Sequence, residues 1–179
     1  YIEFLDDTEC SIVHKCEIDA EELCKFAGQL CYQSFGEKRT KNKDIDKYLH
    51  NIKKQKHGSV FEHANYSFLF YGVSRSLTHE LVRHRAGFAY SQVSQRYADD
   101  RHLRFVCRPE IFNDPIMKDI FEYDIDETMK RYKHRRDWFK ELYKDLDIPI
   151  VEQIKKANQV ARSVLPNETE TQIVVTANV

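Results

Sequence analysis

The sequence predicts a single soluble domain of the α+β class, and three observations support this prediction. The chain has 179 residues, a length typical of one domain with a sizeable core. Its residues are 41% hydrophobic and 32% charged, as in ordinary soluble globular proteins. Segments with apolar residues at helical spacing alternate with short runs rich in β-branched and aromatic residues. Because no repeat, low-complexity tract or linker is visible, we expect residues 1–179 to form one domain.

The N-terminal part predicts a strand followed by a helix. Tyr1–Leu5 is a β-prone run that ends at two aspartates, and we expect it to form the first strand. Asp19 is a suitable N-cap for the helix, and Ser34–Gly36 should end it. Apolar residues at helical spacing predict its buried face, which comprises Leu23, Phe26, Ala27, Leu30 and Cys31.

A lysine-rich segment, residues 44–56, predicts a second amphipathic helix. Its inward-facing residues are expected to be Ile45, Tyr48, Leu49 and Ile52. The histidine-containing stretch 57–63 should form a turn. Residues 64–73 alternate aromatic and small residues, which is typical of a strand.

A third helix is expected to begin after Ser74, continue through Arg85 and stop at Gly87. Leu77 and Leu81 should form its buried stripe. Three basic residues at four-residue spacing should share one face, namely Arg75, His79 and Arg83.

The second half of the chain predicts two helices and two strands. Residues 103–107 look like a strand, and Asp114–Pro115 should begin a long helix through Tyr143. A further helix is expected at 152–165, and the β-branched run 171–178 should form a strand of the main sheet. The interior of the long helix is expected to contain Ile120, Phe121, Met129, Tyr132, Trp138, Phe139 and Leu142.

Charge, hydropathy and cysteine content restrict the location and the partners. The formal net charge is −1, so the whole molecule does not attract nucleic acid strongly and any anion site must be local. No apolar run is long enough to span a bilayer, and no signal peptide is visible. The five cysteines form no CxxC pair, which favours reduced thiols and a cytoplasmic protein.

Arginines are concentrated in the middle of the chain. Residues 58–117 contain seven arginines and no lysine. Within them, the stretch Arg83–Tyr97 reads RHRAGFAYSQVSQRY and contains no acidic residue. Arginine binds phosphate or carboxylate through two parallel hydrogen bonds. The pattern fits a phosphate site, and it fits equally a solvated basic helix end that pairs with acids from another helix.

Common nucleotide and metal motifs are absent. The chain contains neither GxGxxG nor GxxxxGK[ST], so no Rossmann dinucleotide site or P-loop is indicated. The histidines at 57, 63, 79 and 84 fit no zinc spacing and have no cysteine among them. We therefore expect no metal, and any nucleotide or flavin must be held by arginines and loop polar groups.

Five sequence blocks carry a resemblance to a known family. The run RHR-x8-S-x-RY, preceded by Thr78–Val82, resembles the signature of the flavin-dependent thymidylate synthases. The other blocks follow in the order of that family and span nearly the whole chain. They are Cys31–Phe35, His57–His63, Ala161–Pro166 and Val174–Asn178.

The chain departs from the pattern of that family at three points. Eight residues separate RHR from Ser94, where many members have seven, and a bulge or an extra loop residue can absorb the difference. Gln92 stands where many members have Glu, and its amide can still bind a uracil edge. The chain stops at Val179, whereas the family continues with a helix that carries another substrate-activating arginine. We therefore expect that a C-terminal tail is missing.

The resemblance implies a fold and an activity. The fold would be a mixed, mainly antiparallel twisted sheet flanked by helices, in a homotetramer with shared active sites. The enzyme, a methyltransferase, would convert dUMP to dTMP with methylenetetrahydrofolate as carbon donor. FAD, reduced by NADPH, would supply the hydride. A modified pyrimidine in place of dUMP and a different reductant both stay open.

The resemblance also implies the site residues. FAD would be bound by Ser34, His57, Ser59, Arg83, His84, Arg85 and Asn178. The nucleotide would be bound by Glu80, Gln92, Ser94, Gln95, Arg96 and Arg162. Catalytic roles would fall to Arg83, Ser94 and Arg162.

Two other classes of protein fit the sequence. A single-strand nucleic-acid binding module would also place arginines among aromatic residues such as Phe88, Tyr90 and Tyr97. A catalytically silent family member, which binds nucleotide or serves in assembly, would keep the fold and lose turnover. The absorption spectrum of the purified protein distinguishes a nucleic-acid binding module from a flavoprotein, because bound flavin is yellow and nucleic acid is not.

Overall fold

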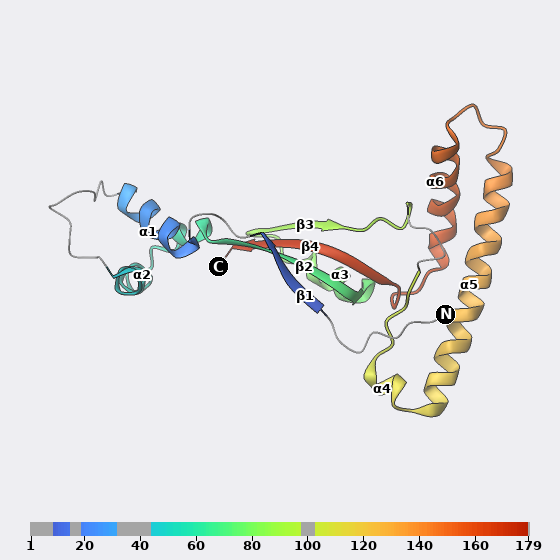
Figure 1. Cartoon of the computed structure of the whole chain (residues 1–179), viewed down its shortest axis with the longest axis horizontal. Coiled ribbons are helices and arrows are strands. Elements are labelled where there is room, and N and C mark those ends of the chain that lie inside the picture. The colour runs from blue at the N-terminus through green and yellow to red at the C-terminus, as the bar shows by residue number, and fades with distance from the viewer. Residues whose placement is uncertain (1–8, 15–18, 32–43, 98–102, 179) are drawn as a thin grey trace. The chain divides into compact units, whose positions relative to one another are not determined.

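The computed structural model (Figure 1) describes residues 9–14, 19–31, 44–97 and 103–178. Within these ranges the chain forms helices and a small antiparallel sheet, which confirms the α+β class. The strand predicted at Tyr1–Leu5 and the helix end predicted at Ser34–Gly36 lie outside the described residues. No helix in the described ranges is both long enough and apolar enough to cross a membrane.

The described residues form a four-stranded sheet. Its strands are β1 (Glu9–His14), β2 (Asn65–Ser74), β3 (Phe88–Gln92) and β4 (Glu170–Asn178). Their order across the sheet is β1-β2-β4-β3, and β4 runs opposite to β2 and β3 (Figure 1). The hydroxyl groups of Ser67 and Thr176, 2.8 Å apart, pair β2 with β4. The strand predicted at 171–178 is therefore confirmed as a central strand.

The chain divides into two compact units, and each combines segments that are distant in sequence. Unit 1 includes Phe70–Arg83 and Ser91–Ile173. Unit 2 consists of Cys10–Leu69, His84–Tyr90 and Val174–Val179. The strands β2, β3 and β4 each contribute residues to both units, so the division does not follow the order of the elements along the chain.

Unit 1 contains a long helical hairpin (Figure 1). The carboxylate of Asp114 caps α5 (Pro115–Leu142) and accepts hydrogen bonds from two amides of its first turn, at 2.9 and 3.1 Å. The second arm is α6 (Ile150–Ala161), which packs against α5. The shorter elements of this unit are α3 (Arg75–Leu81), α4 (Pro109–Phe112) and the 3-10 turn η4 (Arg162–Val164). The buried core beside α5 consists of Phe105, Cys107, Phe121 and Ile125.

Unit 2 contains α1 (Ala20–Cys31), α2 (Ile45–Lys54) and the 3-10 helix η2 (Gly58–His63). Asp19 accepts a hydrogen bond from the amide of Glu21 at 2.9 Å, which confirms it as a capping residue. The core of this unit is formed by Tyr48, Ile52 and Val60, with Leu49 and Phe61 packed against it. The inward face predicted for α2 is therefore confirmed.

Three elements differ from the sequence prediction in extent. The helix predicted at 152–165 spans Ile150–Ala161 and is followed by a 3-10 turn. The helix after Ser74 ends at Leu81 rather than at Arg85: the amide of Val82 still bonds to Thr78 at helical spacing, but that of Arg83 bonds to Glu80 and closes a tighter turn. The stretch 103–107 forms only an isolated bridge between Phe105 and Thr169. This stretch lies alongside the residues that immediately precede β4, and the amide of Val106 donates to the carbonyl of Glu168 at 2.8 Å.

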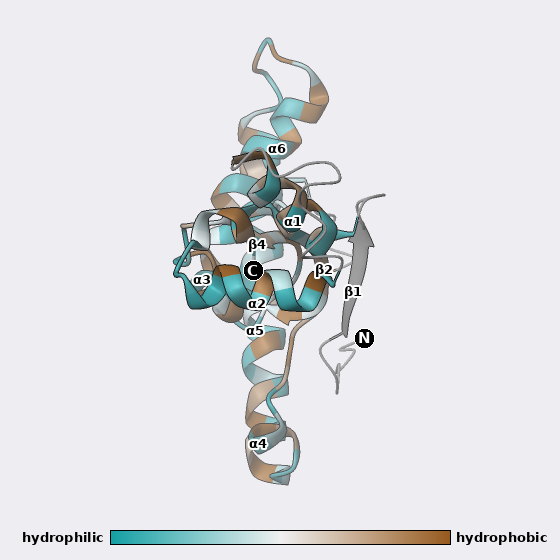
Figure 2. Cartoon of the chain, turned by 90° about the vertical axis from the view of Figure 1, so that its left-hand side faces the viewer, coloured by the Kyte–Doolittle hydropathy of each residue, from teal (hydrophilic) through white to brown (hydrophobic). Residues whose placement is uncertain are grey.

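Several residues predicted to be buried are exposed. Trp138 on α5 is 66% exposed, and Phe26 and Leu30 on α1 are 53% and 54% exposed. The other corrections of this kind are Cys31, Leu77, Ile120 and Leu142. Hydrophobic and hydrophilic residues alternate along α2 and α5 (Figure 2). The helical spacing of apolar residues therefore identified the apolar faces, but it could not show which of these side chains are buried within a single chain.

Candidate functional site

Arg75, the first residue of α3, lies close to Arg162, the first residue after α6. Burial lowers the pKa of Arg75, and the positive charge of Arg162 lowers it further. The Nη1 atom of Arg75 donates a hydrogen bond to the carbonyl oxygen of Val93 at 3.4 Å. Neither arginine forms an ion pair with an acid among the described residues. Two neighbouring like charges without an acidic partner are suited to an anion.

Arg96 lies in the turn after β3 and is attached to α6. The side-chain amide of Asn158 donates a hydrogen bond to the carbonyl oxygen of Arg96 at 3.0 Å. The amide of Arg96 donates to the hydroxyl of Ser94 at 3.4 Å. The guanidinium of Arg96 lies over the ring of Tyr97, 5.7 Å from its centre, and the ammonium of Lys155 lies 5.3 Å from the same ring. Hydrogen bonds to Tyr97 and Glu152 raise the pKa of Lys155.

Gln92, at the end of β3, is held by two buried threonines. Its side-chain nitrogen lies 2.8 Å from the hydroxyl of Thr78 and 3.3 Å from that of Thr171. Thr78 donates its own proton to the carbonyl of Arg75 at 3.1 Å, so its oxygen is free to accept from Gln92. No described residue donates a hydrogen bond to the amide oxygen of Gln92. The side chain therefore offers an acceptor to a ligand.

A small polar hollow of about 260 Å³ lies beside Arg75, Thr78 and Gln92. It lies within unit 1. Its lining consists of Arg75, Thr78, His79, Val82, Gln92 and Asn167. A hollow with a guanidinium at one side and amide groups at the other can hold a small phosphorylated molecule.

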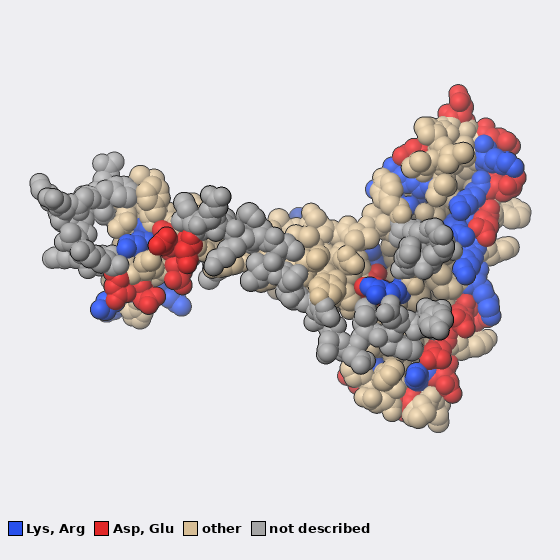
Figure 3. All heavy atoms as spheres, viewed as in Figure 1, with Lys and Arg blue, Asp and Glu red and all other residues tan. Residues whose placement is uncertain are grey.

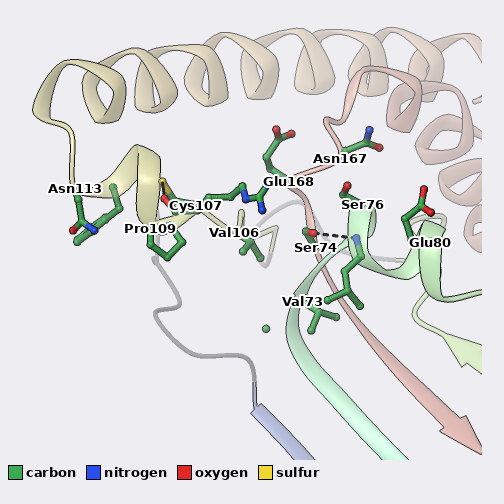
Figure 4. Close-up of a pocket in the computed structure, with 14 residues that line it drawn as sticks. Val73, Ser74, Ser76, Glu80, Val106, Cys107, Pro109, Asn113, Asn167 and Glu168 are labelled. Atoms are coloured by element: carbon green, nitrogen blue, oxygen red, sulfur yellow. Dashed lines mark hydrogen bonds between the residues drawn. The ribbon is translucent and has the colours of Figure 1, made fainter.

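A second, larger hollow in unit 1 contains only one of the predicted site residues. It has a volume of about 870 Å³ and lies between the end of β2, α3 and the segments 106–113 and 167–168 (Figure 4). Ser74 caps α3 at its edge by accepting a hydrogen bond from the amide of Leu77 at 3.2 Å. Glu80 lines this hollow and pairs with Arg83 at 3.3 Å, and both side chains are exposed. An exposed pair of this kind contributes little stability, so both groups are available to a ligand.

In unit 2, the turn at Gly87 brings together His84, Arg85 and Asn178. Gly87 has a φ of +73°, and the side chain of Asn178 lies where a Cβ atom of residue 87 would be. The amide of Asn178 donates to the carbonyl of Gly87 at 3.0 Å, and the hydroxyl of Tyr90 donates to the carbonyl of His84 at 2.7 Å. Phe88 stacks between the rings of His84 and Tyr90, with both ring-centre distances at 5.9 Å. The glycine therefore allows these two distant segments to meet.

His57 and Ser59 lie at the start of η2 and are exposed. Ser59 borders an apolar hollow of about 300 Å³, formed mainly by α1. Ser34 lies outside the described residues. The remaining predicted residue, Gln95, is half-buried in the turn beside Arg96.

The predicted residues separate by unit. All residues predicted for the nucleotide belong to unit 1, and the described residues predicted for the flavin belong to unit 2, except Arg83. Arg83, to which we assigned flavin binding and a catalytic role, is the last residue of its segment in unit 1, and His84 is the first of the next segment in unit 2.

Four residues that the sequence did not assign to the site take part in it, namely Arg75, Thr78, Asn158 and Thr171. Two of them had a sequence signal. Arg75 stands four residues before His79 on α3, and Asn158 precedes Arg162 by four residues, so the members of each pair lie on a common helix face. The threonines had none, because their contacts with Gln92 depend on tertiary packing, that of α3 against β3 for Thr78 and the pairing of β3 with β4 for Thr171.

Cys107, the one cysteine near arginines in sequence, is a core residue. It is 7% exposed and packs against Phe105 and α5. Burial raises the pKa of its thiol, although Lys118 lowers it partly. A buried thiol with a raised pKa is a weak nucleophile. In the described residues, no group of three His, Cys, Asp or Glu side chains lies close enough to hold a metal ion.

The fold and the arginine cluster define an α+β protein with a site suited to a phosphorylated ligand. The sequence model of one family, described as thymidylate synthase complementing protein, matches residues 13–179. The chain belongs to this family, and the resemblance seen in its motifs is confirmed.

Curated relatives carry the name flavin-dependent thymidylate synthase. The protein of Mycobacterium avium is 41% identical over 156 residues, and that of Mycobacterium tuberculosis H37Rv is 42% identical over 156 residues. Both alignments cover 87% of this chain and 62% of the relative. The chain therefore spans less than two thirds of the length of these relatives.

Solved structures share the fold. A UMP/dUMP methylase, PolB from Streptomyces cacaoi bound with 5-Br UMP, superposes with a TM-score of 0.61 at 17% identity and covers 99% of this chain and 74% of that one. Thymidylate Synthase X from Helicobacter pylori with FAD and dUMP has a TM-score of 0.55 at 20% identity, covering 96% and 78%. At such identities the likeness concerns the fold.

Proposed function

We propose that the intact protein methylates dUMP to dTMP, with methylenetetrahydrofolate as carbon donor and FAD, reduced by NADPH, as hydride source. Membership of the family and the names of the curated relatives support this activity. The observation that carries the proposal is the half-buried guanidinium of Arg75, which lines the polar hollow together with Gln92, feels the positive charge of Arg162 and has no acidic partner in the described residues. A nucleoside monophosphate has about two negative charges near neutral pH, and these guanidiniums are suited to neutralise them.

The nucleotide would bind in unit 1. Arg96 and Arg162 would hold the phosphate together with the hydroxyl of Ser94, and Arg75 would add a further cation. Gln92 would present its amide oxygen to the sugar or to the uracil edge, since its nitrogen is bonded to Thr78 and Thr171. Glu80 and Gln95 would complete the polar lining.

The catalytic contribution of the chain would be electrostatic. Negative charge develops on the pyrimidine ring during carbon transfer, and a fixed cation beside the ring stabilises it. We assign this role to Arg83 and Arg162, with Ser94 orienting the nucleotide. No cysteine nucleophile is required in this scheme, which agrees with the burial of Cys107.

The residues around Gly87 fit a flavin dinucleotide. Arg85, His84 and the side-chain amide of Asn178 would be a donor set suited to pyrophosphate and ring oxygens, and the bare Cα of Gly87 permits the close approach of Asn178. His57, Ser59 and Ser34 would add contacts from other segments of the chain. When bound, FAD supplies the reducing hydride.

We further propose a homotetramer in the cytoplasm, in which residues 1–179 form one domain of a longer protein. Exposed apolar side chains on α6, such as Ile150 at 71% and Val151 at 65%, support the assembly. The free thiols of Cys24, Cys31 and Cys107 support a reducing compartment.

A product assay tests the activity. The intact protein is incubated with dUMP, methylenetetrahydrofolate, NADPH and FAD, and each component is omitted in turn. We expect dTMP only in the complete mixture. Tight dUMP binding without dTMP, in a protein that holds flavin, would indicate the catalytically silent member instead.

A further inference from the structure

Asn158 is a buried polar residue that is not explained by the packing of α6. It lies one turn before the end of the helix and is 5% exposed. Burying a side-chain amide is unfavourable unless it forms hydrogen bonds. Its nitrogen donates to the carbonyl oxygen of Arg96 at 3.0 Å, a residue that stands 62 positions earlier in the chain.

The backbone of Asn158 is bonded to the second arginine. The amide of Arg162 donates to the carbonyl oxygen of Asn158 at the end of α6. One residue therefore bonds to Arg96 through its side chain and to Arg162 through its main chain. The two arginines that we assign to the phosphate are fixed to the same helical turn.

The other bonds of the Arg96 turn are mostly local. The amides of Arg96 and Tyr97 donate to the hydroxyl and the carbonyl of Ser94, at 3.4 and 3.2 Å. These bonds shape the turn but do not attach it to α6. Lys155 of α6 also contacts the ring of Tyr97 and forms a hydrogen bond to that side chain, but Tyr97 is 61% exposed, and an exposed contact restrains the turn less than a buried hydrogen bond does.

We propose that Asn158 is a positioning residue of the nucleotide site, which holds the main chain of Arg96 on α6 so that Arg96 and Arg162 serve the same phosphate. This inference rests on the proposed function. The turn that carries Arg96 is only half-buried, and the bond to Asn158 ties the main chain of Arg96 to α6. Holding it in place before the ligand arrives removes an ordering cost from binding.

The test replaces Asn158 by leucine, which has a similar size and no donor, in the intact protein. The control is Gln153→Leu on the same helix, because the amide of Gln153 also donates to main-chain carbonyls, those of Lys144, Leu146 and Ile148. Both variants should lose some thermal stability. Only Asn158→Leu should weaken dUMP binding, measured by calorimetry, by about tenfold, the effect of one lost hydrogen bond. It should raise KM for dUMP more than it lowers kcat.

A double-mutant cycle separates positioning from general damage. In an Arg96→Ala background, Asn158→Leu should change dUMP affinity by less than about twofold, because its effect passes through Arg96. A tenfold loss in both backgrounds would overturn the inference. If the leucine variant does not fold, Asn158→Ser takes its place, since serine can bond to its own helix but is too short to reach Arg96. Wild-type affinity in that variant would also overturn the inference.

The outcome also separates this inference from the proposed function. Failure of the wild-type protein to bind dUMP would reject both. Binding that Arg96→Ala weakens but Asn158→Leu does not would reject the positioning role alone.

Discussion

Arg75 is the residue whose environment most clearly requires a ligand. It is partly buried and close to another guanidinium, and in the described residues it has only a carbonyl oxygen as side-chain partner. Arginine stays protonated at any ordinary pH, so this charge cannot be relieved by loss of a proton. A bound phosphate would relieve it.

We expect Arg75→Ala to weaken dUMP binding by about 1.5–3 kcal/mol, the range for hydrogen bonds to charged groups. Calorimetric titration of the folded variant measures this. The matched control is Arg108→Ala, because Arg108 is exposed and, within the described part of the chain, its acidic partner is Glu110 at 3.8 Å. Equal losses of affinity in both variants would show that Arg75 acts through overall charge rather than through contact.

Cys107 gives a prediction in the opposite direction. We expect Cys107→Ala to keep most of its turnover, because a buried thiol with a raised pKa is not the nucleophile. The thiol should also make stability depend on pH. The pKa of the thiol is higher in the folded than in the unfolded chain. Its contribution to the free energy of unfolding is therefore complete below the ordinary pKa of 9.0 and is lost as the pH rises through the pKa of the folded state.

Two measurements check this prediction. Mass spectrometry of a trapped reaction should show no pyrimidine linked to Cys107. Urea unfolding at increasing pH above 9.0 should show wild-type stability falling toward that of the alanine variant. A Cys107 adduct together with loss of activity in the folded variant would reject the mechanism.

The turn at Gly87 is the element on which the flavin residues depend. Gly87→Ala should destabilise the protein by at least about 1 kcal/mol, since alanine is strained at a φ of +73° and its Cβ would meet Asn178. It should also weaken FAD binding, measured by fluorescence. Gly58→Ala is the matched control, because no atom lies within 4 Å of a Cβ there and we expect no loss of stability. Unchanged FAD affinity in Gly87→Ala would remove this turn from the flavin site.

Elements with long, regular patterns were predictable from the sequence. The long helix α5 with its Asp114 cap, α2 with its buried face and the β-branched strand β4 all occur as expected. The helix after Ser74 ended early, because the backbone bond from Arg83 to Glu80 closes it before Gly87. Such a stop leaves no mark in apolar periodicity.

The site was predictable only in part for a related reason. Arginines and polar residues in family motifs could be named from the chain, but their partners depend on tertiary pairing. Thr171 meets Gln92 because β3 lies beside β4, and Thr78 meets it because α3 packs against the end of β3. Asn158 meets Arg96 only because the turn after β3 lies against α6. None of these pairs has a spacing that sequence periodicity could reveal.

On the face shown in Figure 3, acidic and basic side chains are mixed along α5. This mixture is in keeping with a net charge of −1. This distribution gives no extended basic surface on the face shown, so it favours a local anion site over a nucleic-acid binding module.

Assembly can be tested by complementation. We expect a mixture of two inactive variants, Arg83→Ala and Arg162→Ala, to regain activity if the two residues meet across subunits, because hybrid sites would contain both arginines. Activity is measured after subunit exchange, which mass spectrometry of labelled protein verifies. The control mixes each variant with itself. Proven exchange without recovery would place both arginines in the site of one subunit.

A single-turnover experiment tests the central claim most directly. The intact protein with reduced FAD is mixed with dUMP and methylenetetrahydrofolate without oxygen, while flavin absorbance and dTMP are measured in the same sample. We predict that one flavin is oxidised for each dTMP formed, and that neither change occurs without dUMP. Formation of dTMP while the flavin stays reduced would contradict the proposed function.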